Sequence, residues 1–166
     1  WLEDDTATEL FEIPNYELHL NSNGRGKGIA IYFKKDTIRH VIDIKEENMQ
    51  LSKFTSDAID LVVLYRSQNG SHSALIEILE TLIDREKPIL VIGDFNFCFL
   101  DDSSNLTKRY FQKNFFSQLV EQPTHIEGNL IDQAHVRDMK EDNHYSLELQ
   151  SKYYTDHKGL AVLIKR

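Results

Sequence analysis

The sequence predicts an α/β fold in which central β-sheets are covered by helices. Apolar, β-branched runs at residues 59–65 and 88–93 are typical of strands buried on both faces. Apolar residues at helical spacing follow each of these runs and indicate amphipathic helices packed against a sheet. The chain has 166 residues and no repeat or low-complexity linker, so we expect a single domain over residues 1–166.

Further strands are expected where β-rich or alternating segments lie between turn residues. Residues 28–33 form one such segment, and residues 37–44 are expected to be its hairpin partner. A turn at residues 21–24 ends the first strand. The remaining predicted strands cover residues 16–20, 130–136, 145–150 and 160–165.

The sequence predicts two amphipathic helices, and we interpret the apolar stripe of each as a surface that faces the core. Ser71 or Ser73 is placed to cap the first helix. Its stripe consists of Leu75, Ile78, Leu79, Leu82 and Ile83, and the stripe of the second helix consists of Leu106, Tyr110, Phe111, Phe115 and Leu119.

The net charge is -8, from 19 Lys and Arg residues against 27 Asp and Glu residues. This balance argues against a tight, non-specific nucleic-acid binder, which normally presents a basic face. It does not exclude a nuclease, because a site that holds a cation must itself be acidic. One local basic cluster consists of Arg25, Lys27, Lys34, Lys35, Arg39 and His40. On charge alone, we interpret it as a solvated surface, and contact with a polyanion is the alternative.

The sequence shows no sign of secretion or membrane insertion. Its one cysteine, Cys98, cannot form an intramolecular disulfide and lies in an apolar stretch, where we interpret it as a packing residue. Residues 1–5 lack the basic and apolar regions of a signal peptide, and the apolar runs are too short to cross a bilayer. We therefore expect an intracellular protein without a membrane partner.

The strongest candidate for chemistry lies at the end of the strand that begins at Pro88. Asp94 and Asn96 end it two residues apart, so both side chains point the same way if the strand persists. The carboxylate can take a proton from water or hold a metal ion, and the amide can donate to a phosphate oxygen. Asp and Asn are also common in turns, so an ordinary strand end is the alternative.

Three weaker candidates lie in or beside other predicted strands. Asp156 and His157 precede the last strand and offer a metal ligand and an imidazole for a phosphoryl oxygen, although a plain surface loop has the same pattern. Asp132 lies in an apolar strand and needs a partner such as an imidazole, unless it faces water from an edge. Tyr65 and Arg66 can bind phosphate, or can be a core aromatic and an Arg that reaches solvent.

Together and in this order, these residues resemble one family, the endonuclease/exonuclease/phosphatase superfamily with its deoxyribonuclease-I-like fold. The matching motifs are its Tyr-Arg strand end (Tyr65, Arg66), its Gly-Asp-x-Asn (Asp94, Asn96), its Leu/Ile-Asp strand (Asp132) and its Ser/Thr-Asp-His (Asp156, His157). The resemblance is greatest to endonuclease domains of transposable elements, through Ile13-Pro14-Asn15-Tyr16, Gly26-Lys27-Gly28-Ile29-Ala30-Ile31-Tyr32 and Gln122-Pro123-Thr124-His125.

The resemblance implies a two-sheet α/β sandwich with outer helices that hydrolyses phosphodiesters, with DNA as the expected substrate and Mg2+, or Mn2+, as cofactor. It also implies that Asp94 activates the attacking water and that His157, oriented by Asp132, stabilises the developing negative charge. In the same scheme the phosphate is bound by Tyr65, Arg66, Asn96 and His157, and the metal by Asp156 and Asp94. The protein would be nuclear, and other domains of a larger polypeptide would accompany this one.

One departure from the family pattern concerns the N-terminus. In relatives a Glu-Thr dipeptide, whose Glu binds the metal, often precedes Trp-Leu, whereas this sequence begins at Trp1. We therefore expect a truncated domain that lacks its first strands and, alone, hydrolyses DNA poorly. Two alternatives stay open, namely a lipid or inositol phosphate substrate on the same fold, and an inactive nucleic-acid-binding remnant.

Overall fold

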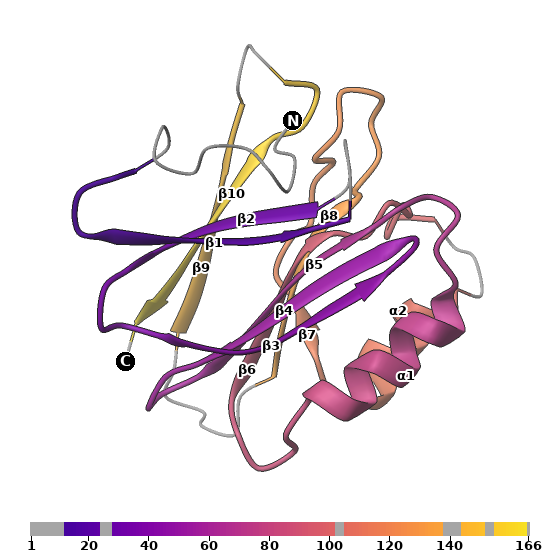
Figure 1. The fold of residues 1–166 in the computed structure, drawn as a ribbon. Coiled ribbons are helices and arrows are strands. Elements are labelled where there is room, and N and C mark those ends of the chain that lie inside the picture. The colour runs from indigo at the N-terminus through magenta and orange to yellow at the C-terminus, as the bar shows by residue number, and fades with distance from the viewer. Residues whose placement is uncertain (1–11, 24–27, 102–104, 138–143, 152–154, 166) are drawn as a thin grey trace.

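The computed structural model describes residues 12–23, 28–101, 105–137, 144–151 and 155–165. Its centre is a six-stranded sheet of order β3-β4-β5-β6-β8-β7, and two two-stranded sheets pair β1 with β2 and β9 with β10. Figure 1 shows both helices on one side of the large sheet and both small sheets on the other. The predicted α/β sandwich with outer helices is confirmed, but in the described residues the second layer consists of two separate hairpins instead of one sheet.

Most neighbouring strands of the described residues are antiparallel, and the parallel pair β5 and β6 is joined through α1. The bounds of the elements are β1 Tyr16–Ser22, β2 Gly28–Lys34, β3 Arg39–Glu46, β4 Met49–Thr55, β5 Asp60–Arg66, α1 His72–Leu82, β6 Ile89–Asp94, α2 Leu106–Lys113, β7 Ser117–Gln118, β8 Asp132–Arg137, β9 His144–Gln150 and β10 Gly159–Lys165.

The helices cover one face of the large sheet through residues that alternate along its strands. Val62 and Leu64 of β5 are buried on this face and join Leu75 and Leu79 of α1 in one apolar cluster. The helix begins after Ser71, whose hydroxyl accepts a hydrogen bond from a backbone N–H of the first turn. The predicted stripe and the predicted Ser71 cap of this helix are therefore confirmed.

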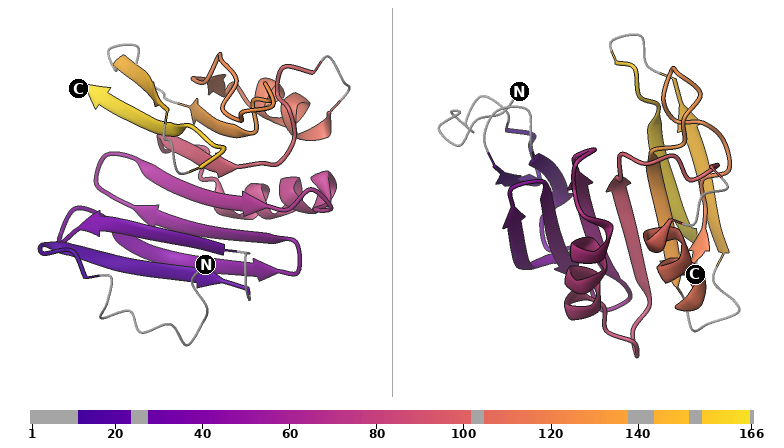
Figure 2. Two further views of the ribbon diagram at one scale, coloured as in Figure 1. Left: turned by 90° about the horizontal axis from the view of Figure 1, so that it is seen from above. Right: turned by 90° about the vertical axis from the view of Figure 1, so that its right-hand side faces the viewer.

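The opposite face of the large sheet carries the two hairpins. Leu90 of β6 and Val136 of β8 pack there against partly buried leucines of β9 and β10. Figure 2 shows the hairpins well separated, with β1–β2 at the β3 end of the sheet and β9–β10 over β6 and β8. Because β6 lies between two apolar layers, its sequence is apolar on both faces until Gly93.

The predicted pairing of residues 37–44 with residues 28–33 is wrong. β2 pairs with β1, and β3 pairs with β4, which the sequence pattern did not reveal. β4 contains the buried polar residues Gln50 and Ser52, and these break the apolar pattern of a buried strand. Both side chains form hydrogen bonds, from Gln50 Nε2 to the carbonyl of Glu46 at 3.0 Å and from the Ser52 hydroxyl to Asp43 Oδ1 at 2.7 Å.

The first hairpin also differs in its turn. β1 runs through Ser22, so the predicted turn at residues 21–24 begins later than expected, and residues 24–27 lie outside the described residues. Arg25 and Lys27 of the predicted basic cluster fall in that segment. The four described members of the cluster are exposed, at Lys34, Lys35, Arg39 and His40.

The second helix is shorter than the predicted stripe. α2 ends at Lys113, and Asn114 caps it through a side-chain amide that donates to the carbonyl of Tyr110 at 2.9 Å. Phe115 follows with φ 59° and is 87% exposed, so it is not a core residue. The predicted stripe therefore joined helix and loop positions, and of its members Phe111 is the buried one on the helix. Neither described helix is long and apolar enough to cross a membrane.

Candidate active site

The ends of three adjacent strands form the candidate site. β6 runs parallel to β5 and antiparallel to β8. Their register places Tyr65 beside Asp94 and places Asp94 opposite Asp132. Three predicted site residues, far apart in sequence, therefore lie on neighbouring strands at one edge of the fold.

Asp94 is held in place by the residue two positions later. Its Oδ1 accepts a hydrogen bond from the backbone N–H of Asn96 at 2.9 Å, and its Oδ2 accepts one from the Asn96 side-chain amide at 3.0 Å. The same amide donates to the carbonyl of Arg66 at 2.9 Å. Asn96 adopts φ 49°, a left-handed conformation that Asn tolerates better than most residues. Because both amide protons have protein acceptors, the geometry makes Asn96 a positioning group for Asp94, and its phosphate contact stays a prediction.

A second pair of side chains approaches from β8 and from the loop before β10. His157 Nδ1 lies 2.8 Å from Asp132 Oδ2, so the predicted hydrogen bond between these residues is confirmed. Donation through Nδ1 leaves Nε2 as the ring nitrogen available to a substrate. Burial lowers the pKa of His157, but the hydrogen bond and charge of Asp132, with the charges of Asp94 and Asp156, outweigh this and raise it.

The site carries more negative charge than its own side chains neutralise. Burial, together with the charge of Asp132, raises the pKa of Asp94 to about 6, against the lowering effect of the Asn96 hydrogen bond. Ionising Asp94 therefore costs free energy in the metal-free protein. A divalent cation would relieve this cost, and carboxylate oxygens are the donors that Mg2+ prefers. The residues present thus fit a hard metal ion.

The potential ligand atoms fall into two groups that share His157. One group joins Asp94 and Asp132 with His157, and the other joins His125 and Asp156 with His157; in each, the ligand atoms lie within 4.8 Å of one another. The predicted metal ligands Asp94 and Asp156 therefore belong to different groups. Asp156 is exposed, so it can turn toward solvent or toward a bound ion.

His125 is a site residue to which the sequence motifs gave no chemical role. Its Nε2 lies 3.3 Å from Asp156 Oδ2, and its ring meets that of His157 edge-on with centroids 5.1 Å apart. An antiparallel bridge between the two histidines fixes this arrangement. The sequence offered only an isolated His after Pro123-Thr124, without a spacing that indicates a ligand.

Arg66 does not reach the site, which corrects its predicted role in phosphate binding. Side chains alternate along β5, so Tyr65 faces the site while Arg66 turns to the helix side, where it is 3% exposed. Its guanidinium donates to the carbonyls of Phe95 at 2.7 Å and Gly70 at 2.6 Å. Arg66 therefore anchors the loop that carries Asn96. Tyr65 stays available, and burial followed by the charge of Asp94 raises its pKa, which keeps the phenol protonated as a donor.

The raised pKa of Asp94 predicts a pH dependence of stability in the metal-free protein. Folded Asp94 holds its proton up to about pH 6, whereas the ordinary pKa of the group is 3.8, so the folded state binds more protons between these values. Stability contributed by this group is complete at low pH and is lost as pH rises through about 6. We expect the free energy of unfolding of the wild type, relative to Asp94→Asn, to fall by about 1–3 kcal/mol between pH 4 and pH 7.

This expectation can be checked by urea unfolding in the presence of EDTA, with wild type and Asp94→Asn measured at each pH. Parallel pH profiles for the two proteins would show that burial and the charge of Asp132 do not raise the pKa of Asp94 in the folded protein.

Comparison with known proteins identifies the fold. No family model and no curated protein matches the chain. The endonuclease domain of TRAS1, a telomere-specific non-LTR retrotransposon, superposes with a TM-score of 0.69 at 14% identity, over 93% of this chain and 80% of that one. The human Nocturnin catalytic domain superposes with a TM-score of 0.62 at 13% identity, over 96% of this chain and 77% of that one.

A third solved structure has the same fold. An endonuclease/exonuclease/phosphatase family protein from Bacteroides thetaiotaomicron gives a TM-score of 0.59 at 13% identity, over 92% of this chain and 76% of that one. The architecture shared with these structures is the same layered one that the sequence predicted. The chain therefore has the deoxyribonuclease-I-like fold of the endonuclease/exonuclease/phosphatase proteins.

Proposed function

We propose that this domain hydrolyses phosphodiesters with the help of a divalent metal ion, and that its substrate is DNA, which it nicks. The observation that carries the proposal is the Asp132–His157 hydrogen bond of 2.8 Å beside the half-buried carboxylate of Asp94. In the metal-free protein, where its pKa is about 6, Asp94 is ionised at neutral pH, and a carboxylate can accept a proton from water. The pair and the carboxylate would together provide a base and an electrophilic donor for one phosphate, because the ligand atoms of Asp94, Asp132 and His157 lie within 4.8 Å of one another.

Each side chain has a distinct task in this scheme. Asp94 orients the attacking water and takes its proton, while Asn96 keeps the carboxylate in place. As the water oxygen bonds to phosphorus, the bond from phosphorus to the leaving sugar oxygen breaks, and that oxygen takes a proton from solvent. His157, held by Asp132 through Nδ1, donates through Nε2 to a phosphoryl oxygen as negative charge develops there. The Tyr65 phenol donates to the same phosphate. Mg2+ held by Asp94 and Asp156 would supply Lewis-acid polarisation of the phosphoryl group.

DNA is the proposed substrate because of the kind of protein that the chain resembles in structure and in motif. The TRAS1 neighbour is the endonuclease domain of a non-LTR retrotransposon. With a net charge of -8, the chain would depend on the metal and on local donors, rather than on a basic face, to meet a polyanion. In the same proposal the domain acts in the nucleus as part of a larger polypeptide of a mobile element.

The substrate class can be tested by offering the protein three phosphoesters at equal phosphate concentration with Mg2+. These are a supercoiled plasmid, an inositol polyphosphate and phosphoinositide vesicles. The assay is run on the 166-residue chain and on a version to which the Glu-Thr dipeptide of the relatives is added before Trp1. From the version with the added dipeptide we expect plasmid nicking without release of inorganic phosphate from the other two substrates, and from the 166-residue chain slower nicking. Phosphate release without nicking would replace DNA by an inositol phosphate, and failure on all three substrates would remove the proposed activity.

The Asp132–His157 pair should act on the chemical step. Asp132→Ala leaves the imidazole in place but removes the group that orients it, so we expect kcat to fall by about 10–100-fold while KM changes little. Steady-state nicking of a short labelled duplex gives both parameters. The control is Asp57→Asn, which alters an exposed acid in the loop between β4 and β5. A raised KM with unchanged kcat would give the pair a role in substrate binding.

A further inference from the structure

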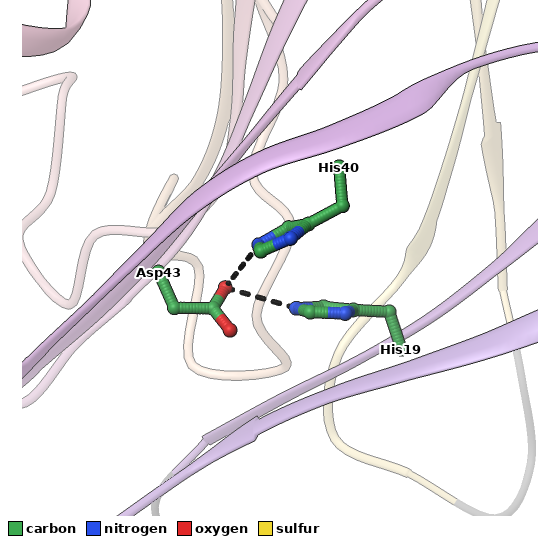
Figure 3. Close-up of side chains that lie close together, drawn as sticks. All are labelled: His19, His40 and Asp43. Atoms are coloured by element: carbon green, nitrogen blue, oxygen red, sulfur yellow. Dashed lines mark hydrogen bonds and ion pairs between the residues drawn. The ribbon is translucent and has the colours of Figure 1, made fainter.

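A second cluster of metal-binding side chains lies at the other end of the large sheet, away from the candidate active site. His19 of β1, His40 of β3 and Asp43 of β3 converge there. Figure 3 shows the two imidazoles stacked one above the other, with both edges directed at one carboxylate oxygen of Asp43. The ring centroids are 4.2 Å apart, and the two Nε2 atoms lie 2.9 Å and 3.1 Å from Asp43 Oδ1.

A β-bulge in the edge strand creates this cluster. In a regular strand, His40 and Asp43 are three residues apart and would point to opposite faces. The register between β3 and β4 shifts between His40 and Ile42, so that His40 lies opposite Phe54 and Asp43 opposite Ser52. One extra residue on β3 therefore turns both side chains to the same face. Bulges that re-aim a side chain commonly lie beside functional positions.

Neighbouring residues hold the three groups in place. The Ser52 hydroxyl donates to Asp43 Oδ1 at 2.7 Å, and the ring of Phe54 meets both imidazoles edge-on. Burial raises the pKa of Asp43, but the hydrogen bonds from Ser52, His19 and His40 outweigh this and lower it, so the group is a carboxylate at neutral pH. The side chains of His19 and His40 are 19% and 36% exposed, which leaves an edge of the cluster open to solvent.

The three groups are close enough together to share one metal ion, because their ligand atoms lie within 4.8 Å of one another. A tetrahedral ion bonded at about 2.0–2.1 Å holds neighbouring ligand atoms about 3.3 Å apart, so the two N–O separations of 2.9 Å and 3.1 Å would widen slightly to admit it. Two imidazoles with one carboxylate suit Zn2+, with water as the fourth ligand, whereas Mg2+ prefers oxygen ligands throughout. Without a metal, both imidazoles and a hydroxyl must all donate to the same oxygen atom.

We propose that His19, His40 and Asp43 bind Zn2+ and that the ion ties the β1–β2 hairpin to the edge of the large sheet. His19 stands on the hairpin and the other two ligands stand on β3, so the ion bridges two separate sheets. The site shares no residue with the Asp94 and His157 groups. It is therefore independent of the proposed nuclease activity, and removing its ligands does not touch the active site.

The test is Zn2+ binding followed by NMR of the histidine rings and by calorimetry, with Mg2+ as the comparison ion. A rival site exists at His125, Asp156 and His157, so the calorimetry uses a His125→Ala/His157→Ala background. In that background we expect one Zn2+ per chain, with loss of the Nε2 proton signals of His19 and His40. His40→Gln, at an exposed position, and the isosteric Asp43→Asn should each weaken binding by about 100-fold or more. The matched control Asp57→Asn should bind as the background does.

Thermal unfolding supplies a readout of the bridge itself. Saturating Zn2+ should raise the Tm of the background protein, because the ion binds the folded state alone, and should leave the Tm of Asp43→Asn unchanged. Absence of Zn2+ binding in the background would overturn the proposal. Binding that survives both His40→Gln and Asp43→Asn, or that perturbs other histidines and spares His19 and His40, would overturn it as well.

Discussion

Asp94→Asn is expected to lower the single-turnover rate of plasmid nicking by about 10³-fold or more. The amide has the shape of the carboxylate but cannot accept a proton from water, and it contributes no charge to a metal site. The loss should appear in the chemical step, since Tyr65 and His157 still meet the phosphate. Because removal of a strained carboxylate does not weaken the fold, the variant should unfold at a Tm no lower than that of the wild type in EDTA.

The matched control for this prediction is Asp57→Asn, which makes the same chemical change at an exposed loop position. It should nick at the wild-type rate. Equal rates for Asp94→Asn and wild type would remove Asp94 from the mechanism and, with it, the assignment of the strand-end motif.

Gly93→Ala is expected to have the largest effect on stability, with a loss of about 3 kcal/mol or more in the free energy of unfolding. Gly93 lies in β6 with φ 152°, a conformation that side chains rarely adopt. A Cβ added there would overlap the carbonyl oxygen of Leu64 on the adjacent strand β5. Removing this overlap requires β5 and β6 to separate. Their separation would also displace Asp94, one residue later.

Gly128→Ala provides a control that separates the two causes. Gly128 also has a positive φ, 86°, but nothing lies within 4 Å of its added Cβ. We expect it to cost about 1 kcal/mol, from backbone conformation alone. Urea unfolding of both variants measures the difference, and equal losses would show that β5 and β6 can accommodate the methyl group.

The positions that form the candidate site could be predicted from the sequence because each lies at or beside the end of a strand. Asp94 follows an unbroken apolar run, and Asp132 interrupts one, so both carboxyl groups contrast with the apolar residues around them. The Asp132–His157 partnership could be expected for a physical reason, since an acid in an apolar strand needs a hydrogen-bond partner. The two-residue period of a strand predicts that Arg66 points away from the face of Tyr65. The family motif instead suggested that both side chains bind phosphate.

Other features depend on contacts between distant residues and could not be predicted from local patterns. β4 is buried although Gln50 and Ser52 are polar, because both side chains donate hydrogen bonds to residues of β3. His125 reaches the site through a bridge to His157, far along the chain, and no spacing rule links them. The bulge that turns His40 and Asp43 to one face is likewise visible only in the register of β3 against β4.

The rate of plasmid nicking as a function of Mg2+ concentration tests most directly the claim that Asp94, Asp132 and His157 form one metal-dependent hydrolytic site. The measurement uses the version of the chain with the Glu-Thr dipeptide added before Trp1, with the Asp94→Asn/His157→Ala double variant beside it. Nicking should rise to saturation with Mg2+, vanish in EDTA, and in the double variant fall no further than in the worse single variant, because the groups act as a unit. Nicking that persists unchanged in EDTA, or in the double variant, would contradict the account.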